Sequence, residues 1–216
     1  MRFILPFALV VLAAPAAGQS IDCAKLKSGL APFAITYEVK RDVGPGKATS
    51  TTGTEQSQIF RKAGETVAYS VLAPTRYLRI RSTASPLFPV EAYISSPAKL
   101  RRWSYSIDPK VDPLVRRQPL DFTAEQREED GSVFLKAHMV LTFSGAEKVQ
   151  VGGCSFDVVK TMRSVDGTVD GKPIANRNEV WVSPELRAAL FTRIDDPSYV
   201  VTYTTKGISL DFKPVE

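Results

Sequence analysis

The sequence has few of the residues from which catalytic and metal sites are usually built. It contains one histidine and two cysteines among 216 residues. The Cys-x-x-Cys spacing of structural zinc sites is absent from the sequence, and so is the Gly-x-Ser-x-Gly elbow of α/β-hydrolases. We therefore expect no metal ion, no cofactor and no catalytic residue, and we predict that the protein is not an enzyme.

Three short segments offer some chemistry, but each has a simpler interpretation. His138 lies within an alternating apolar segment, where a lone histidine is usually structural or exposed. Adjacent carboxylates at 128–130 and 195–196 are of the type used in glycoside hydrolysis, but their turn-forming neighbours favour solvated loops. The segment 166–172 contains Asp-Gly pairs, which favour a hairpin over a calcium loop because the closing Glu of an EF-hand is missing.

Long apolar runs are also missing beyond the N-terminal segment. No later stretch reaches fifteen consecutive apolar residues, whereas a membrane-spanning helix needs about 20. At the N-terminus, a positive Met1-Arg2 precedes an apolar run to Ala14 and small residues up to Gly18. We therefore predict a secretory signal peptide over residues 1–18 and a single β-rich periplasmic domain over residues 19–216. Export makes nucleic acid a poor partner, and any membrane contact is expected to be peripheral.

The two cysteines, Cys23 and Cys154, are predicted to form one disulfide, since paired cysteines in an exported chain are usually oxidised. The bond would close a loop of about 130 residues, for which the chain-entropy argument gives an upper value of about 5 kcal/mol. It would hold the N-terminal segment against the sheet. Metal binding is the less favoured alternative, because only one histidine is available.

The net charge of +5 is unevenly distributed. Between Pro74 and Arg117 there are nine basic residues and three acidic ones, and an acidic stretch follows at 125–130. We call residues 74–117 the basic segment. Solvated strand faces and loops are the simpler explanation. The alternative is a surface for anionic partners such as phospholipid head groups, lipopolysaccharide or acidic glycans.

Most of the chain alternates between apolar and polar residues with a period of two. Residues 33–40 place the apolar residues from Phe33 to Val39 on one face, which predicts a half-buried strand. Turn signals containing Gly separate many such segments, and closely spaced strands favour an antiparallel meander. The other predicted strands cover residues 54–62, 66–72, 77–82, 90–94, 100–107, 134–143, 156–165, 177–182, 199–205 and 208–212.

Two or three short helices are expected beside these strands. One covers Ser20–Leu30, with Ser20 or Asp22 as its N-cap. A second covers Pro184–Phe191, because Ser183, Pro184 and Glu185 form a helix-start signature. A third is considered at Thr123–Glu129. The stretch Asp108–Pro119 carries three prolines without periodicity and is predicted to be a long loop.

The strand around residue 103 carries the candidate ligand-binding residues. Trp103 and Tyr105 alternate with serines and follow Arg101 and Arg102, so an aromatic face next to positive charge is predicted. The alternative is that the two aromatic rings belong to the core.

The segment from Val151 to Ile194 suggests a family. It contains a Gly-Gly-Cys turn, a strand with an outward Lys, a hairpin, a strand ending in Trp181, and a Ser-Pro-Glu-Leu helix start. This order resembles uncharacterised bacterial periplasmic domains with a curved sheet of the LolA and LolB lipoprotein-carrier type. The resemblance implies a mainly β fold, a curved antiparallel half-barrel whose short helices cover a hydrophobic cavity for acyl chains.

These observations lead to two functional expectations. The first is an exported periplasmic binding protein for a lipid-like or amphiphilic ligand. The second is a structural or protein-interaction module that binds an envelope protein and has no small-molecule ligand. A deep apolar cavity would favour the first, and a filled core the second. A hydrolase would instead require a cleft where carboxylates converge.

Overall fold

The computed structural model describes residues 21–29, 31–62, 65–73, 76–83, 85–95, 97–110 and 112–214. The predicted signal peptide over residues 1–18 lies outside this part of the chain. No helix within the described ranges is long and apolar enough to cross a membrane.

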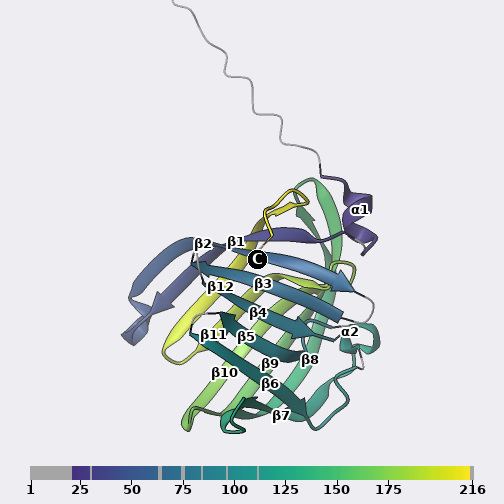
Figure 1. Ribbon diagram of the computed structural model, residues 1–216. Coiled ribbons are helices and arrows are strands. Elements are labelled where there is room, and N and C mark those ends of the chain that lie inside the picture. The colour runs from purple at the N-terminus through teal and green to yellow at the C-terminus, as the bar shows by residue number, and fades with distance from the viewer. Residues whose placement is uncertain are drawn as a thin grey trace, which may run out of the picture.

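Twelve antiparallel strands form one closed barrel in which each strand pairs with its neighbours in the sequence (Figure 1). The meander order follows from the short turns between alternating segments. The strands are β1 (Phe33–Val43), β2 (Thr49–Lys62), β3 (Glu65–Ala73), β4 (Arg76–Ser82), β5 (Pro89–Ser95), β6 (Ala98–Tyr105), β7 (Leu120–Glu128), β8 (Val133–Val151), β9 (Cys154–Val169), β10 (Lys172–Ser183), β11 (Ala188–Asp196) and β12 (Tyr199–Ser209).

The mainly β class is confirmed, but the expected half-barrel is wrong because the sheet closes. β1 pairs with β2 along one edge and with β12 along the other, from Ala34 opposite Ser209 to Val43 opposite Tyr199. β1 is therefore paired on both sides from Ala34 to Val43, and the barrel has no free edge there. Alternation within a strand predicts its inner face but not its partner, so closure was not visible in the sequence.

The helices are short and lie outside the sheet. α1 (Cys23–Lys27) confirms the core of the predicted N-terminal helix, and the Asp22 carboxylate caps it by accepting from the Lys25 amide at 2.9 Å. α2 (Pro113–Arg116) lies within the predicted loop 108–119 and is capped by Asp112. A single 3₁₀ turn, η1 (Pro45–Lys47), joins β1 to β2.

Two predicted helices are wrong. Residues 184–187 form a single turn, and Ala188–Asp196 is strand β11. The Ser183 hydroxyl accepts from the Leu186 amide at 3.4 Å, so the helix-start signature is used for this turn alone. Residues 123–128 belong to β7, where Phe122, Ala124 and Gln126 are buried in alternation.

Turn predictions are confirmed at 130–131, 152–153 and 170–171. The pair Asp166-Gly167 is not a turn but part of β9, opposite β8 and β10. A Cβ atom at Gly167 would lie 2.1 Å from the carbonyl oxygen of Lys136, so this glycine permits a close approach between strands.

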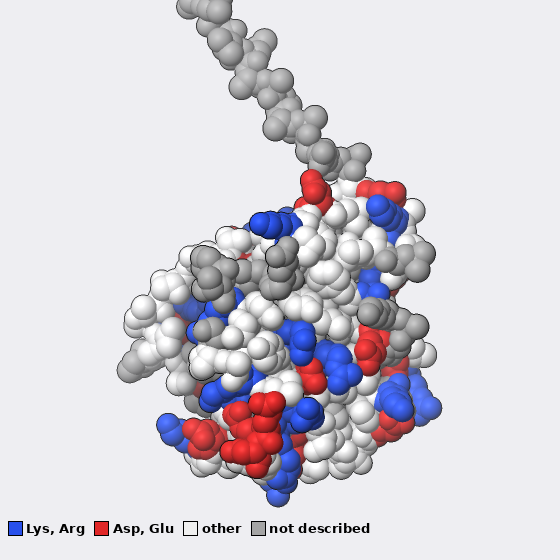
Figure 2. Space-filling model, in the orientation of Figure 1, with Lys and Arg blue, Asp and Glu red and all other residues white. Residues whose placement is uncertain are grey.

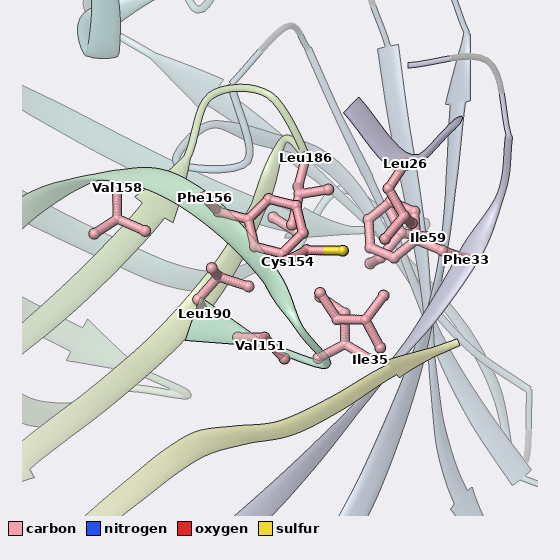
Figure 3. Packing of buried hydrophobic residues seen from close by; sticks show 12 residues of the cluster. Leu26, Phe33, Ile35, Ile59, Val151, Cys154, Phe156, Val158, Leu186 and Leu190 are labelled. Atoms are coloured by element: carbon pink, nitrogen blue, oxygen red, sulfur yellow. The ribbon is translucent and has the colours of Figure 1, made fainter. Parts of the chain in front are cut away.

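The barrel interior holds two hydrophobic clusters. The first packs Leu26 of α1 against Phe33, Phe156 and other side chains at one end of the barrel (Figure 3). The second includes Phe88, Phe122 and Leu141 and receives Trp103 and Tyr105 at its border.

The predicted disulfide between Cys23 and Cys154 is confirmed, and it joins α1 to the start of β9. Arg61 of β2 strengthens the same junction because its guanidinium donates to the carbonyl oxygens of Leu26, Ala31 and Glu185 at 2.8–3.0 Å. The N-terminal segment is therefore held over one end of the barrel by one covalent bond and by partly buried hydrogen bonds.

Candidate functional site

The barrel holds a half-open cavity of about 490 Å³ that neither hydrophobic cluster fills. Its walls come from β1–β4 on one side and from β11 and β12 on the other. A cavity of this size lies within the usual range for small-molecule sites, about 300–1,000 Å³. The cavity is therefore the candidate functional site.

One wall is apolar because three neighbouring strands place matching residues on the inner face. Ile59 of β2 lies opposite Ala68 of β3, and Ala68 lies opposite Ile80 of β4. All three line the cavity, together with Leu78. The small side chain of Ala68 between two isoleucines leaves space that a larger residue would occupy.

One end of the cavity is polar. Arg41 and Glu55 form an ion pair there, and Tyr203 lies beside them. Burial lowers the pKa of Arg41, but the hydrogen bond and charge of Glu55 outweigh it and raise this pKa overall. The two side chains keep 39% and 26% of their surface exposed, so solvent reaches the cavity at this end. In Figure 1 the β1–β2 hairpin projects there beyond its neighbours.

Further polar groups lie along the walls. The Tyr37 hydroxyl donates to the Ala189 carbonyl oxygen at 2.8 Å, and burial raises the pKa of Tyr37. The hydroxyls of Ser57 and Ser70 share a hydrogen bond at 3.0 Å. The buried Thr66 hydroxyl has no hydrogen-bond partner among the described residues. The cavity thus offers an apolar surface with a few polar groups, as sites for amphiphilic molecules do.

The sequence-predicted candidates lie elsewhere in the barrel. Trp103 and Tyr105 pack against the second cluster with stacked rings 6.1 Å apart, and the Tyr105 hydroxyl donates to the Pro89 carbonyl oxygen. Arg101 pairs with Glu128 and lies over the Phe134 ring, while Arg102 is exposed. None of the four is among the residues that line the cavity. Ligand binding by these residues stays a prediction.

The basic segment is less positive in three dimensions than in the sequence. Neighbouring strands bring carboxylates to it, so that Arg79 and Arg81 both pair with Glu91 and Arg81 also pairs with Glu65. Figure 2 shows positive and negative side chains intermixed on this face. The pairing follows from register, which places Arg81 opposite Glu91 across β4 and β5.

The possible hydrolytic groups are separated from the cavity. His138 bonds Asp121 at 2.6 Å, and both are exposed. Asp195 pairs with Lys47, and Asp196 accepts from Ser198. Within the described ranges, no group of three or more metal-ligating side chains gathers.

The cavity itself was not predicted by residue number. Its sequence signal is weak: small residues at inner positions, such as Ser57, Ala68 and Ser70, within strands whose other inner positions are apolar. Those positions become a cavity only when closure brings β2–β4 opposite β11 and β12.

Comparison with known proteins gives similarity in structure alone. Neither a protein family nor a curated protein matches the sequence. The hypothetical lipoprotein YmcC of Escherichia coli K12 is 11% identical, with 82% of this chain and 88% of that chain covered and a TM-score of 0.44. A candidate lipoprotein of Parabacteroides distasonis is 8% identical, with 84% and 96% covered and a TM-score of 0.44.

A third similar structure is a candidate exported protein of Bacteroides fragilis with a YmcC-like fold. It is 9% identical, with 82% of this chain and 95% of that chain covered and a TM-score of 0.42. None of the three is a LolA- or LolB-type carrier by name.

Proposed function

We propose that this protein is an exported periplasmic binding protein that holds a lipid-like or amphiphilic molecule inside its barrel, without catalysing a reaction on it. The observation that carries the proposal is the unfilled cavity of about 490 Å³ between β1–β4 and β11–β12. A protein interior is normally close-packed, so a cavity of this size in the barrel is the default candidate for a binding site.

The distribution of polarity supports an amphiphile over a purely polar ligand. Ile59, Leu78 and Ile80 supply an apolar wall, whereas Arg41 and Glu55 stand at the solvent-accessible end. Burying an apolar chain against such a wall stabilises the complex by about 25 cal/mol for each Å² removed from water. A ligand that buries an apolar body against this wall and also carries a polar group suits such a cavity.

A second function, the protein-interaction module, is favoured by one feature of the outer surface. Rings of Phe60, Tyr69, Tyr77 and Tyr93 follow one another across β2–β5 at centroid distances of 5.4–6.2 Å. Aromatic side chains are enriched where proteins bind one another. This function predicts that the cavity plays no part in binding.

The first experiment is gentle native mass spectrometry of the mature protein, followed by organic extraction. A discrete additional mass that extracts as a lipid would identify the ligand class. Binding of the uncharged fluorophore N-phenyl-1-naphthylamine would then measure access to the cavity. A protein that carries no extractable mass and does not bind the fluorophore would contradict the proposal and favour the interaction module.

Replacing Ala68 with Phe is expected to weaken fluorophore binding at least tenfold. The new ring projects between Ile59 and Ile80 and fills the space that the ligand would occupy. The measurement is a fluorescence titration on protein whose fold is checked by far-UV circular dichroism. The matched control is Ala175→Phe on the exposed face of β10, which should bind as the wild type does. Equal weakening in both variants would contradict binding inside the barrel.

A further inference from the structure

Arg163 is a cation on the inner face of the barrel. It lies near the middle of β9, directly opposite Leu141 of β8 and Asn178 of β10. Leu141 is fully buried and Asn178 is 6% exposed, so this row of residues faces the interior. The Arg163 side chain is half-buried, and burial lowers the pKa of Arg163 below its usual value.

No acidic partner compensates this charge within the described part of the chain. Two other arginines of the barrel differ in this respect, because Arg41 pairs with Glu55 and Arg101 pairs with Glu128. The Nε atom of Arg163 is buried and makes no hydrogen bond to any described residue. An unpaired charge facing a protein interior is costly, so Arg163 is a candidate for a site where a ligand supplies the missing partner.

Three other buried polar atoms without partners accompany Arg163. They are Nε1 of Trp103, Oδ1 of Asn176 and Oδ1 of Asn178. Asn178 is the cross-strand neighbour of Arg163, and Tyr105, on which Trp103 stacks, interacts electrostatically with Arg163. Each asparagine can present either its oxygen or its amide protons when the side chain rotates. Arg163 and Trp103 are fixed donors, so the group as a whole is suited to an oxyanion.

The strand register connects this group to the cavity. Arg41 lies opposite Val201, Val201 opposite Ile194, Ile194 opposite Asn178, and Asn178 opposite Arg163. Arg41 and Ile194 line the cavity. With strands spaced about 4.8 Å apart, the backbone of Arg163 lies about 10 Å from that of Ile194 along the same inner wall. An extended ligand would reach both.

We propose that Arg163, assisted by Trp103 and Asn178, binds the oxyanion head group of an amphiphile whose apolar part lies in the cavity. The head group is a carboxylate or a phosphate, since both accept the paired N–H donors of a guanidinium. This inference rests on the proposed function and specifies the ligand class. It also gives Trp103, predicted from the sequence as a ligand residue, a role inside the barrel.

The test compares cis-parinaric acid with its methyl ester at pH 8, using the fluorescence of the bound polyene. The wild type is expected to bind the acid at least tenfold more tightly than the ester, because only the acid forms charge-assisted hydrogen bonds. In Arg163→Met, the affinity for the acid should fall at least tenfold, to that of the ester, and the affinity for the ester should be unchanged. The matched control Arg177→Met removes an exposed arginine of β10 and should keep the wild-type preference.

The outcomes separate this inference from the proposed function. If neither the acid, the ester nor N-phenyl-1-naphthylamine binds the wild type, the proposed function fails and the inference fails with it. If the acid and ester bind equally, or if Arg163→Met keeps the preference for the acid, the inference alone is wrong. If the inference holds, displacement of bound cis-parinaric acid by oleic acid is compared with its displacement by lysophosphatidic acid. The stronger competitor shows whether the site prefers a carboxylate or a phosphate head group.

A second variant keeps the test decisive if Arg163→Met does not fold. Asn178→Asp places a carboxylate directly opposite Arg163 and supplies an internal partner for its charge. The acid is then expected to lose its advantage of at least tenfold, while the ester binds as before. If this variant still preferred the acid, the proposal that Arg163 binds the head group would be wrong.

Discussion

Replacing Cys23 and Cys154 together with alanine is expected to lower the free energy of unfolding by about 4 kcal/mol. The bond spans 131 residues, and the entropy that a cross-link removes from the unfolded chain grows with the length of the closed loop. Chain entropy alone gives about 5 kcal/mol, and native-state effects usually reduce such values. For a protein of this size the loss corresponds to a fall in Tm of about 10 °C.

The measurement is urea unfolding of the oxidised wild type, the reduced wild type and the double variant. Reduced wild type is the matched control, because it loses the bond but keeps both sulfur atoms. Cys154 is 1% exposed within the first hydrophobic cluster. If the double variant is less stable than reduced wild type, the difference is therefore due to lost packing of the sulfur atoms. A difference below about 1 kcal/mol between oxidised and reduced protein would contradict a stabilising cross-link.

The bond also bears on the site, because it retains α1 over one end of the barrel. α1 has only five residues and is too short to persist by its own hydrogen bonds. Leu26 is fully buried against Phe33 and Phe156, and Arg61 ties the segment to the barrel through three carbonyl oxygens. Loss of the disulfide is therefore expected to loosen this end of the barrel before the sheet itself.

Local patterns in the sequence predicted most strands but not the closed barrel. Alternation identified the inner face of β1, from Phe33 to Val39, because burial on one face leaves a period of two. The same rule applies to β7, but the run of Glu and Gln around Ala124 suggested a helix. Pairing with β6 and β8 overrides that propensity. The helix-start signature at Ser183-Pro184 likewise produces only one turn. The residues after this turn form β11 instead of a helix, and Phe191 pairs with Trp181 of β10.

The candidate site was harder to predict than the fold because its parts come from distant strands. Ala68 and Ile194 line one cavity although they are far apart in the sequence, and only closure between β1 and β12 brings their strands together. Trp103 was predicted as a ligand residue from its neighbours Arg101 and Arg102. Our proposal adds Arg163, which is sixty residues away in the sequence and interacts electrostatically with Tyr105, the ring on which Trp103 stacks. Ion pairs between strands also depend on the strand register, which the sequence does not reveal. Arg81 and Glu91 pair because the register of β4 and β5 places them opposite each other.

Replacing Gly167 with alanine is expected to lower the free energy of unfolding by about 3 kcal/mol. The added Cβ would lie 2.1 Å from the carbonyl oxygen of Lys136 and 2.6 Å from the Cα of Ala137. Both are backbone atoms of β8, so no side-chain rotation can relieve the clash. The β8–β9 ladder must separate locally, which costs hydrogen bonds as well as overpacking strain.

The matched control is Gly53→Ala in β2, where an added Cβ meets nothing within 4 Å. Alanine there restricts the unfolded chain and should leave stability unchanged or raise it by about 0.5 kcal/mol. Thermal unfolding followed by circular dichroism measures both variants, and a drop in Tm of about 8 °C is expected for Gly167→Ala alone. Gly167 and Arg163 are an even number of residues apart on β9 and face the same side, so strand separation at Gly167 should also displace Arg163. If Gly167→Ala were as stable as Gly53→Ala, the close approach of β8 and β9 on which this inner wall depends would be wrong.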